Sequence, residues 1–160
     1  MKKAYSLMLS VVLILLVSTQ VNAQLVTKKT IGLELAKKLV AAAEAQAIKD
    51  NLQFVITIVD DGGNVVCLER MDGAQLGSIE ISMKKAQTSL NFKRPTKSYQ
   101  DRITAGTNAI IALQNVLPFE GGLPLFVDGQ LVGAIGVSGG TSDQDGVVAK
   151  AAADFLAAMK

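Results

Sequence analysis

Two pairs of aspartates are the residues whose spacing could most directly do chemistry in this 160-residue chain: Asp60 with Asp61, and Asp143 with Asp145. Neighbouring carboxylates can bind a hard cation or act as general acid and base. Both pairs lie in stretches typical of turns and helix caps, where aspartate is favoured for backbone reasons, and we favour that interpretation. The chain has no histidine, which excludes the usual catalytic triads and most zinc sites.

Basic residues and turn glycines could instead hold an anion. A basic cluster around Pro95 could bind carboxylates, including the propionates of a porphyrin, although a solvated helix end is the alternative. The cluster consists of Lys84, Lys85, Lys93, Arg94 and Lys97. The glycine pairs 62–63 and 139–140 could hold an anion on their backbone amides, but neither matches a phosphate-loop or dinucleotide-binding fingerprint.

Residues that ligate haem iron in the absence of histidine are also present, namely Met71, Met83, Tyr99 and Cys67. The sequence predicts that Met83 lies on the apolar face of a helix and packs in the core. Cys67, the single cysteine, lies within a predicted strand without a neighbouring base, so we expect a packed thiol. No catalytic residue is assigned. An enzyme that acts on a small acid through its aspartates and Arg94 is a less favoured alternative, because no acid–base pair with obvious spacing is visible.

The first residues have the pattern of a secretory signal peptide. A basic start, an apolar run too short to span a bilayer comfortably and small residues before Gln24 predict that residues 1–23 are removed. We therefore expect an exported protein, periplasmic or extracellular, without a stable membrane anchor. Loss of Lys2 and Lys3 leaves 14 basic and 14 acidic residues, a balance that argues against nucleic acid as a partner. With one cysteine, no internal disulfide can form, so stability must come from packing, including packing between subunits.

Residues 24–160 predict a single α+β domain, an antiparallel sheet flanked by helices. Apolar periodicity predicts the elements in the order helix, hairpin, helices, hairpin, helix. The expected helices are 30–51, capped by Thr30, 78–90, 99–103, 107–116, and a last one capped by Ser142 or Asp143; the expected strands are 54–59, 65–70 and a hairpin over 123–137. In the last helix Val148, Ala151, Ala152, Phe155 and Met159 are expected to face inward.

The second strand of the C-terminal hairpin is unusually rich in small residues. Glycine weakens a strand, so this composition predicts that a ligand, a helix or a neighbouring subunit approaches the backbone closely. The residues concerned are Gly133, Ala134, Gly136, Ser138, Gly139 and Gly140.

Several motifs together resemble the GlcG/HbpS family of haem-binding proteins, which includes the C-terminal domain of the PduO corrinoid adenosyltransferases. They are VDDGGN (59–64), RMDGA (70–74), KAQT (85–88), RPT (94–96), GGLP (121–124) and GAIGVSG (133–139). The resemblance covers the chain from about Thr30 to its end. It implies a small domain with an antiparallel sheet, homo-oligomers, a small-molecule pocket near the sheet and subunit interfaces, and haem binding linked to haem handling or redox sensing.

The resemblance also suggests which residues bind the ligand. They are Arg70, Met71, Lys85, Arg94, Thr96, Tyr99, Gly121 and Gly122, which belong to these motifs or adjoin them. Haem in this chain needs Met, Tyr, Thr, Lys or Cys as the iron ligand, or an iron that is open or water-bound, and the metal-ligating residue is left unassigned. Two alternatives stay open: an exported small-molecule binding or sensory module whose ligand is not haem, and a purely structural oligomer subunit.

Overall fold

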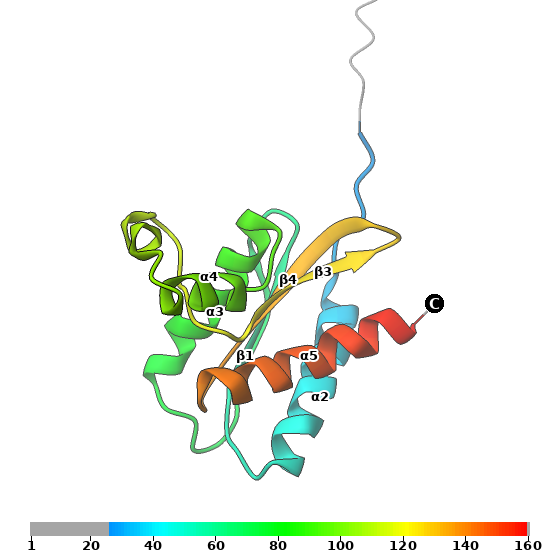
Figure 1. Ribbon diagram of the computed structural model, residues 1–160. Helices are drawn as coiled ribbons and strands as arrows, with labels where there is room; N and C mark the ends of the chain where they lie inside the picture. Colours follow the sequence, from blue (N-terminus) through cyan, green and yellow to red (C-terminus); the bar gives the residue numbers. More distant parts are fainter. Residues whose placement is uncertain (1–25, 160) are drawn as a thin grey trace, which may run out of the picture.

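A four-stranded antiparallel sheet forms the centre of the protein in the computed structural model, which describes residues 26–159 (Figure 1). The strands lie in the order β2-β1-β4-β3. Their bounds are β1 Val55–Asp60, β2 Val65–Arg70, β3 Gly122–Val127 and β4 Gln130–Ser138. Both predicted hairpins are present, and antiparallel pairing of β1 with β4 joins them. The predicted signal peptide, residues 1–23, lies outside the described residues.

Helices cover both faces of the sheet, so the predicted α+β fold is confirmed (Figure 1). One face carries α2 (Leu33–Lys49) and α5 (Ser142–Ala158), and the other carries α3 (Gly77–Phe92). The chain then forms α4 (Lys97–Thr104) and the 3-10 helix η1 (Asn108–Ala112) before it enters β3. Within residues 26–159, no helix has the length and apolar character needed to cross a membrane.

The alternation of side chains along β1 explains the two helical layers. Ile56 and Ile58 are buried in the main core together with residues of α2 and α5. Thr57 and Val59 point the other way, toward α3, where the Thr57 hydroxyl lies 2.8 Å from the hydroxyl of Ser82. A strand that is covered on both faces must be apolar along its whole length, which is why residues 55–59 show no polar alternation beyond Thr57.

Helix α3 is what approaches the glycine-rich strand. A Cβ atom on Gly136 would lie 2.0 Å from the Ser82 carbonyl oxygen and 2.5 Å from the Ala86 amide nitrogen. Both atoms belong to the helix backbone, so only a residue without a side chain allows this contact. Of the three expected causes for the small residues, close helix packing is therefore confirmed within the chain.

The predicted helix over residues 107–116 is wrong. Only Asn108–Ala112 is helical, as a 3-10 turn, and Leu113 is already extended. The apolar residues Ile111 and Leu113 are 69% and 46% exposed, so little tertiary packing stabilises a longer helix. Asn115 then adopts a positive φ of 62°, which directs the chain toward β3.

The ends and faces of two other helices also differ from expectation. α5 is capped by Thr141 rather than by Ser142 or Asp143: its hydroxyl accepts from the Gln144 amide, and the Gln144 side chain accepts from the Thr141 amide. Phe155 and Met159 are exposed, whereas Ala149 and Leu156 are buried. α2 begins after Gly32 instead of Thr30, because the Ile31 amide donates to the Val132 carbonyl of β4.

Candidate functional site

Lys85, one of the predicted ligand-binding residues, is buried in an ion pair. Its side chain is 2% exposed, and its Nζ donates to Asp145 Oδ2 at 2.5 Å and to the Val137 carbonyl at 3.1 Å. Burial lowers the pKa of Lys85 and raises the pKa of Asp145, while the hydrogen bond between them acts in the opposite direction on each. The pair links α3 to the first turn of α5 across the end of the sheet.

One carboxylate of each aspartate pair, Asp60 and Asp145, has structural hydrogen bonds instead of a free position for catalysis or cation binding. Asp145 Oδ1 accepts from the Gly140 amide at 3.0 Å, so this glycine pair does hold an anion, but the anion is the chain's own side chain. Asp60 Oδ1 accepts from the Gly62 and Asn64 amides, both at 2.9 Å, which confirms the interpretation of Asp60 as a turn residue. In the described residues, no group of three or more His, Cys, Asp or Glu side chains could hold a metal ion.

Gly121 and Gly122 are locked against Lys85 and Thr96 at the start of β3. The Gly122 amide donates to Thr96 Oγ1 at 2.9 Å, and the Thr96 amide donates to the Gly122 carbonyl at 3.0 Å. A Cβ on Gly122 would lie 2.4 Å from the Lys85 carbonyl oxygen, and one on Gly121 would lie 2.9 Å from Lys85 Nζ. The four residues thus form one tightly packed cluster in which each contacts another.

Tyr99 and Arg94 adjoin this cluster from α4 and the loop before it. Tyr99 is buried and meets Phe92 edge to face, with ring centroids 5.7 Å apart. The Arg94 guanidinium carbon lies 5.8 Å from the centre of the Tyr99 ring, and Arg94 Nε donates to the Phe92 carbonyl. These contacts hold the segment between α3 and α4 against the body of the protein.

Arg70 and Met71 lie apart from the other predicted residues. Arg70 ends edge strand β2 and Gly122 begins the opposite edge strand β3, so three strand spacings, roughly 14 Å, separate them. Arg70 Nη1 donates to the Ala74 carbonyl, and the Met71 sulfur accepts from the Phe54 amide at 3.4 Å. The structure therefore brings six of the eight predicted residues together and not Arg70 or Met71; the ligand-binding role of all eight stays a prediction.

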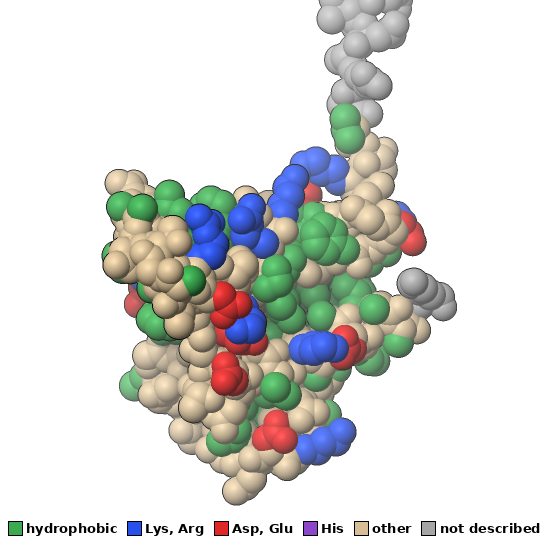
Figure 2. Space-filling model, viewed as in Figure 1, with side chains coloured by type: hydrophobic (Ala, Val, Ile, Leu, Met, Phe, Trp, Pro, Cys, Tyr) green, Lys and Arg blue, Asp and Glu red, His purple; other side chains and the backbone are tan. Residues whose placement is uncertain are grey.

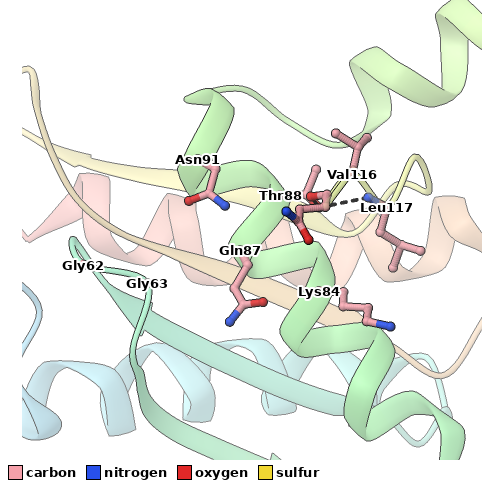
Figure 3. Close-up of a pocket in the computed structure, with 9 residues that line it drawn as sticks. Gly62, Gly63, Lys84, Gln87, Thr88, Asn91, Val116 and Leu117 are labelled. Carbon is pink, nitrogen blue, oxygen red and sulfur yellow. Dashed lines mark hydrogen bonds between the residues drawn. The ribbon is translucent and has the colours of Figure 1, made fainter. Parts of the chain in front are cut away.

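A cavity of about 530 Å³ lies along the outer side of α3, and we call it the α3 pocket (Figure 3). Its lining residues come from α3, the β1–β2 turn and the loop before β3: Gly62, Gly63, Lys84, Gln87, Thr88, Asn91, Asn115, Val116 and Leu117. Among the lining residues, Lys84 and the glycine pair 62–63 are predicted anion-binding groups, but the carboxamides are not, because nothing in their spacing shows that three distant segments meet.

A second hollow, which we call the α5 groove, is mostly apolar and measures about 800 Å³. It is lined by Leu35, Phe126, Val127, Asp128, Gly129, Leu156, Ala157 and Met159. Figure 2 shows hydrophobic side chains gathered between the β3–β4 hairpin and α5. Phe126 and Met159 are 46% and 49% exposed, so an apolar surface and a thioether sulfur are accessible there. The sequence does not predict this groove, because the apolar periodicity of the last helix places Met159 in the core.

The expectation of a packed thiol at Cys67 agrees with its surroundings. Cys67 is partly buried and packs against the main core. Burial raises the pKa of its thiol, and the charge of Glu69 raises it further. Because the thiolate is the reactive form, this environment makes Cys67 a poor nucleophile.

Comparisons with known proteins identify the family. The family model described as "Haem degrading protein HbpS-like" matches residues 31–154. The chain belongs to this family. It is 40% identical over 112 residues to protein GlcG of Escherichia coli K12, a match that covers 70% of this chain and 84% of GlcG. It is also 39% identical over 134 residues to an uncharacterized 15.0 kDa protein of Citrobacter freundii, covering 81% of this chain and 94% of that protein.

Solved structures of relatives share the fold of this HbpS-like chain. Klebsiella pneumoniae protein ORFY superimposes with a TM-score of 0.77 at 35% identity, covering 89% of this chain and all of that one. The structure described as a PduOC:heme complex superimposes with a TM-score of 0.70 at 31% identity, covering 78% of this chain and 94% of that one. The predicted GlcG/HbpS membership, including the relationship to PduO, is confirmed.

Proposed function

We propose that this protein is an exported haem- or tetrapyrrole-binding protein that takes part in haem handling or redox sensing. The observation that carries the proposal is that a relative of the same fold, 31% identical over most of the chain, was crystallised as a haem complex. Export is supported by the signal-peptide pattern of residues 1–23. Homo-oligomers are supported by exposed apolar side chains of α5 outside the groove, Val147 and Phe155.

The residues of the α5 groove fit a haem group. A porphyrin is a large, flat and mainly apolar ligand, and six of the eight residues that line the groove are apolar. Methionine is an established axial ligand of haem iron, and Met159 supplies a thioether at the rim in a chain without histidine. Lys29 lies beside the groove, with its Nζ 2.6 Å from Oδ2 of the groove residue Asp128, and its ammonium supplies a cation for a propionate.

Four side chains at or beside the α5 groove would hold the haem in distinct ways. Phe126 and Leu156 would exclude water from the ring, Met159 would supply a sulfur ligand to the iron, and Lys29, beside the groove, would pair with a propionate. Bound haem supplies a redox-active iron and a strong absorption band. The α3 pocket is a poorer fit for the ring, because only two of its nine lining residues, Val116 and Leu117, have apolar side chains, whereas three carboxamides and one ammonium line it.

A hemin titration of residues 24–160 tests the proposal. We expect a saturable Soret shift. Met159→Leu keeps the apolar volume but removes the sulfur, so it should change the Soret position and weaken binding. Met71→Leu is the matched comparison at the methionine predicted from the sequence: its sulfur is already engaged by the Phe54 amide, so this variant should leave the spectrum unchanged if the haem lies in the α5 groove. A titration without a saturable shift would refute haem binding.

A second pair of variants tests the location. Phe126→Asp puts a charge in the groove and should abolish hemin binding. Phe119→Asp is the control, because Phe119 is similarly exposed, at 52% against 46% for Phe126, but does not line the groove. Equal hemin affinity in the two variants would show that the ring binds elsewhere.

Export is tested separately by determining the N-terminal residue of the protein recovered from its host. We expect Gln24; an intact N-terminal Met1 would contradict export.

A further inference from the structure

The α3 pocket has no part in the proposed haem site. It adjoins the helix on one face of the sheet, whereas the α5 groove is formed by the helices of the other face and shares none of its residues. Its volume of about 530 Å³ lies within the usual range for small-molecule sites. Three separate segments close around it (Figure 3). Because its lining is more polar than that of the α5 groove, we expect the α3 pocket to bind a different kind of ligand.

The charge and hydrogen-bonding capacity of the lining point to an anion. Lys84 is the one charged residue in the lining; its Nζ lies 2.9 Å from Glu80, which leaves further N–H donors of the ammonium for a ligand. No acidic side chain lines the pocket. The carboxamides of Gln87, Asn91 and Asn115 make no hydrogen bond within residues 26–159. Each carboxamide can both donate and accept, as recognition of hydroxyl groups requires.

The walls of the pocket are held in place before any ligand binds. The Thr88 hydroxyl accepts from the Leu117 amide at 3.0 Å and donates to the Asn115 carbonyl at 3.4 Å, which ties the loop to α3. On the opposite wall, the Asp60 carboxylate fixes the turn through the Gly62 amide. Asn115 itself has a positive φ of 62°, a conformation that is uncommon outside glycine and that aims its side chain from a fixed backbone. Fixed walls reduce the entropy lost on binding.

We propose that the α3 pocket binds a small organic anion that carries several hydroxyl groups, of the sugar-acid class. The carboxylate pairs with Lys84, the hydroxyl groups bond with the carboxamides of Gln87, Asn91 and Asn115, and the carbon skeleton lies against Val116 and Leu117. This binding is independent of haem, so the protein has two sites of different chemistry.

Titration calorimetry of residues 24–160 with D-gluconate and with sorbitol, which has the same hydroxyl chain without the charge, tests the proposal. We expect saturable gluconate binding and at least about tenfold weaker sorbitol binding, the loss typical of one charge-assisted hydrogen bond. In two-dimensional NMR, gluconate should shift the side-chain amide signals of Gln87, Asn91 and Asn115.

Lys84→Gln should weaken gluconate binding about tenfold or more. Lys150→Gln is the matched control: Lys150 is also an exposed helical lysine, paired with Asp154 four residues away, but lies outside the pocket. Asn115→Gly should weaken binding too, while glycine retains the positive φ and so the loop. Gluconate binding no tighter than sorbitol binding, or equal effects of the two lysine variants, overturns the proposal. Lys84→Gln should leave hemin binding unchanged, which separates this test from that of the haem site.

Discussion

Substitution of Gly136 by alanine tests whether the fold depends on contact between the backbones of α3 and β4. The new Cβ would lie 2.0 Å from the Ser82 carbonyl oxygen, whereas ordinary van der Waals contact begins at 3.4 Å. The helix must therefore move outward by more than an ångström, because neither contacting atom belongs to a flexible side chain. Such a movement also loosens the packing of Ala86 and Leu90 on Val59. We expect Gly136→Ala to lower the free energy of unfolding by about 3 kcal/mol, the upper part of the range for overpacked cores.

Urea unfolding of residues 24–160 measures this loss, which should also lower the melting temperature by about 10 °C. Gly77→Ala is the control in the same helix, because nothing lies within 4 Å of its added Cβ, and it should leave stability unchanged or slightly higher. If Gly136→Ala unfolds within about 0.5 kcal/mol of the wild type, the reasoning is refuted.

Three further substitutions probe other contacts. Lys85→Met leaves a buried carboxylate without its partner and should cost about 3–5 kcal/mol in urea unfolding, whereas addition of Asp145→Leu should recover part of the loss. Thr141→Ala removes the cap of α5 and should cost about 1 kcal/mol, against little change for Ser142→Ala. Slight burial raises the pKa of Asp60, but hydrogen bonds from Asn64 and Gly62 outweigh it and hold the pKa below its ordinary value, so Asp60→Asn should destabilise at pH 7. The difference in free energy of unfolding between Asp60→Asn and the wild type should shrink as the pH falls through the lowered pKa of Asp60. A difference that does not change with pH would contradict this reasoning.

Local patterns predicted most of the secondary structure because each signal depends on near neighbours in sequence. Strand β2 was predicted with its observed bounds, since the turn after Asp60 and the break after Arg70 both lie next to it. The helix predicted over residues 107–116 was wrong for the same reason: its apolar spacing is typical of a helix, but Ile111 and Leu113 are exposed, so little tertiary packing stabilises a longer helix.

The candidate sites depended much more on tertiary contacts. The adjacent residues Lys84 and Lys85 are equivalent in a list of basic residues, yet one lines the α3 pocket and the other is buried in an ion pair. Their environments differ because consecutive residues of a helix point about 100° apart, and only the position of the sheet decides which one is covered.

The sequence by itself determined the α+β class, both hairpins, the family and the absence of a histidine ligand, because these follow from residue types and short spacings. Only the tertiary structure decided what approaches Gly136, which aspartate Lys85 pairs with, and which side chains line the two hollows. Those outcomes depend on contacts between segments far apart in the chain, such as Lys85 and Asp145, which are 60 residues apart. Such contacts form only when the helices pack on the sheet, so no local pattern encodes them.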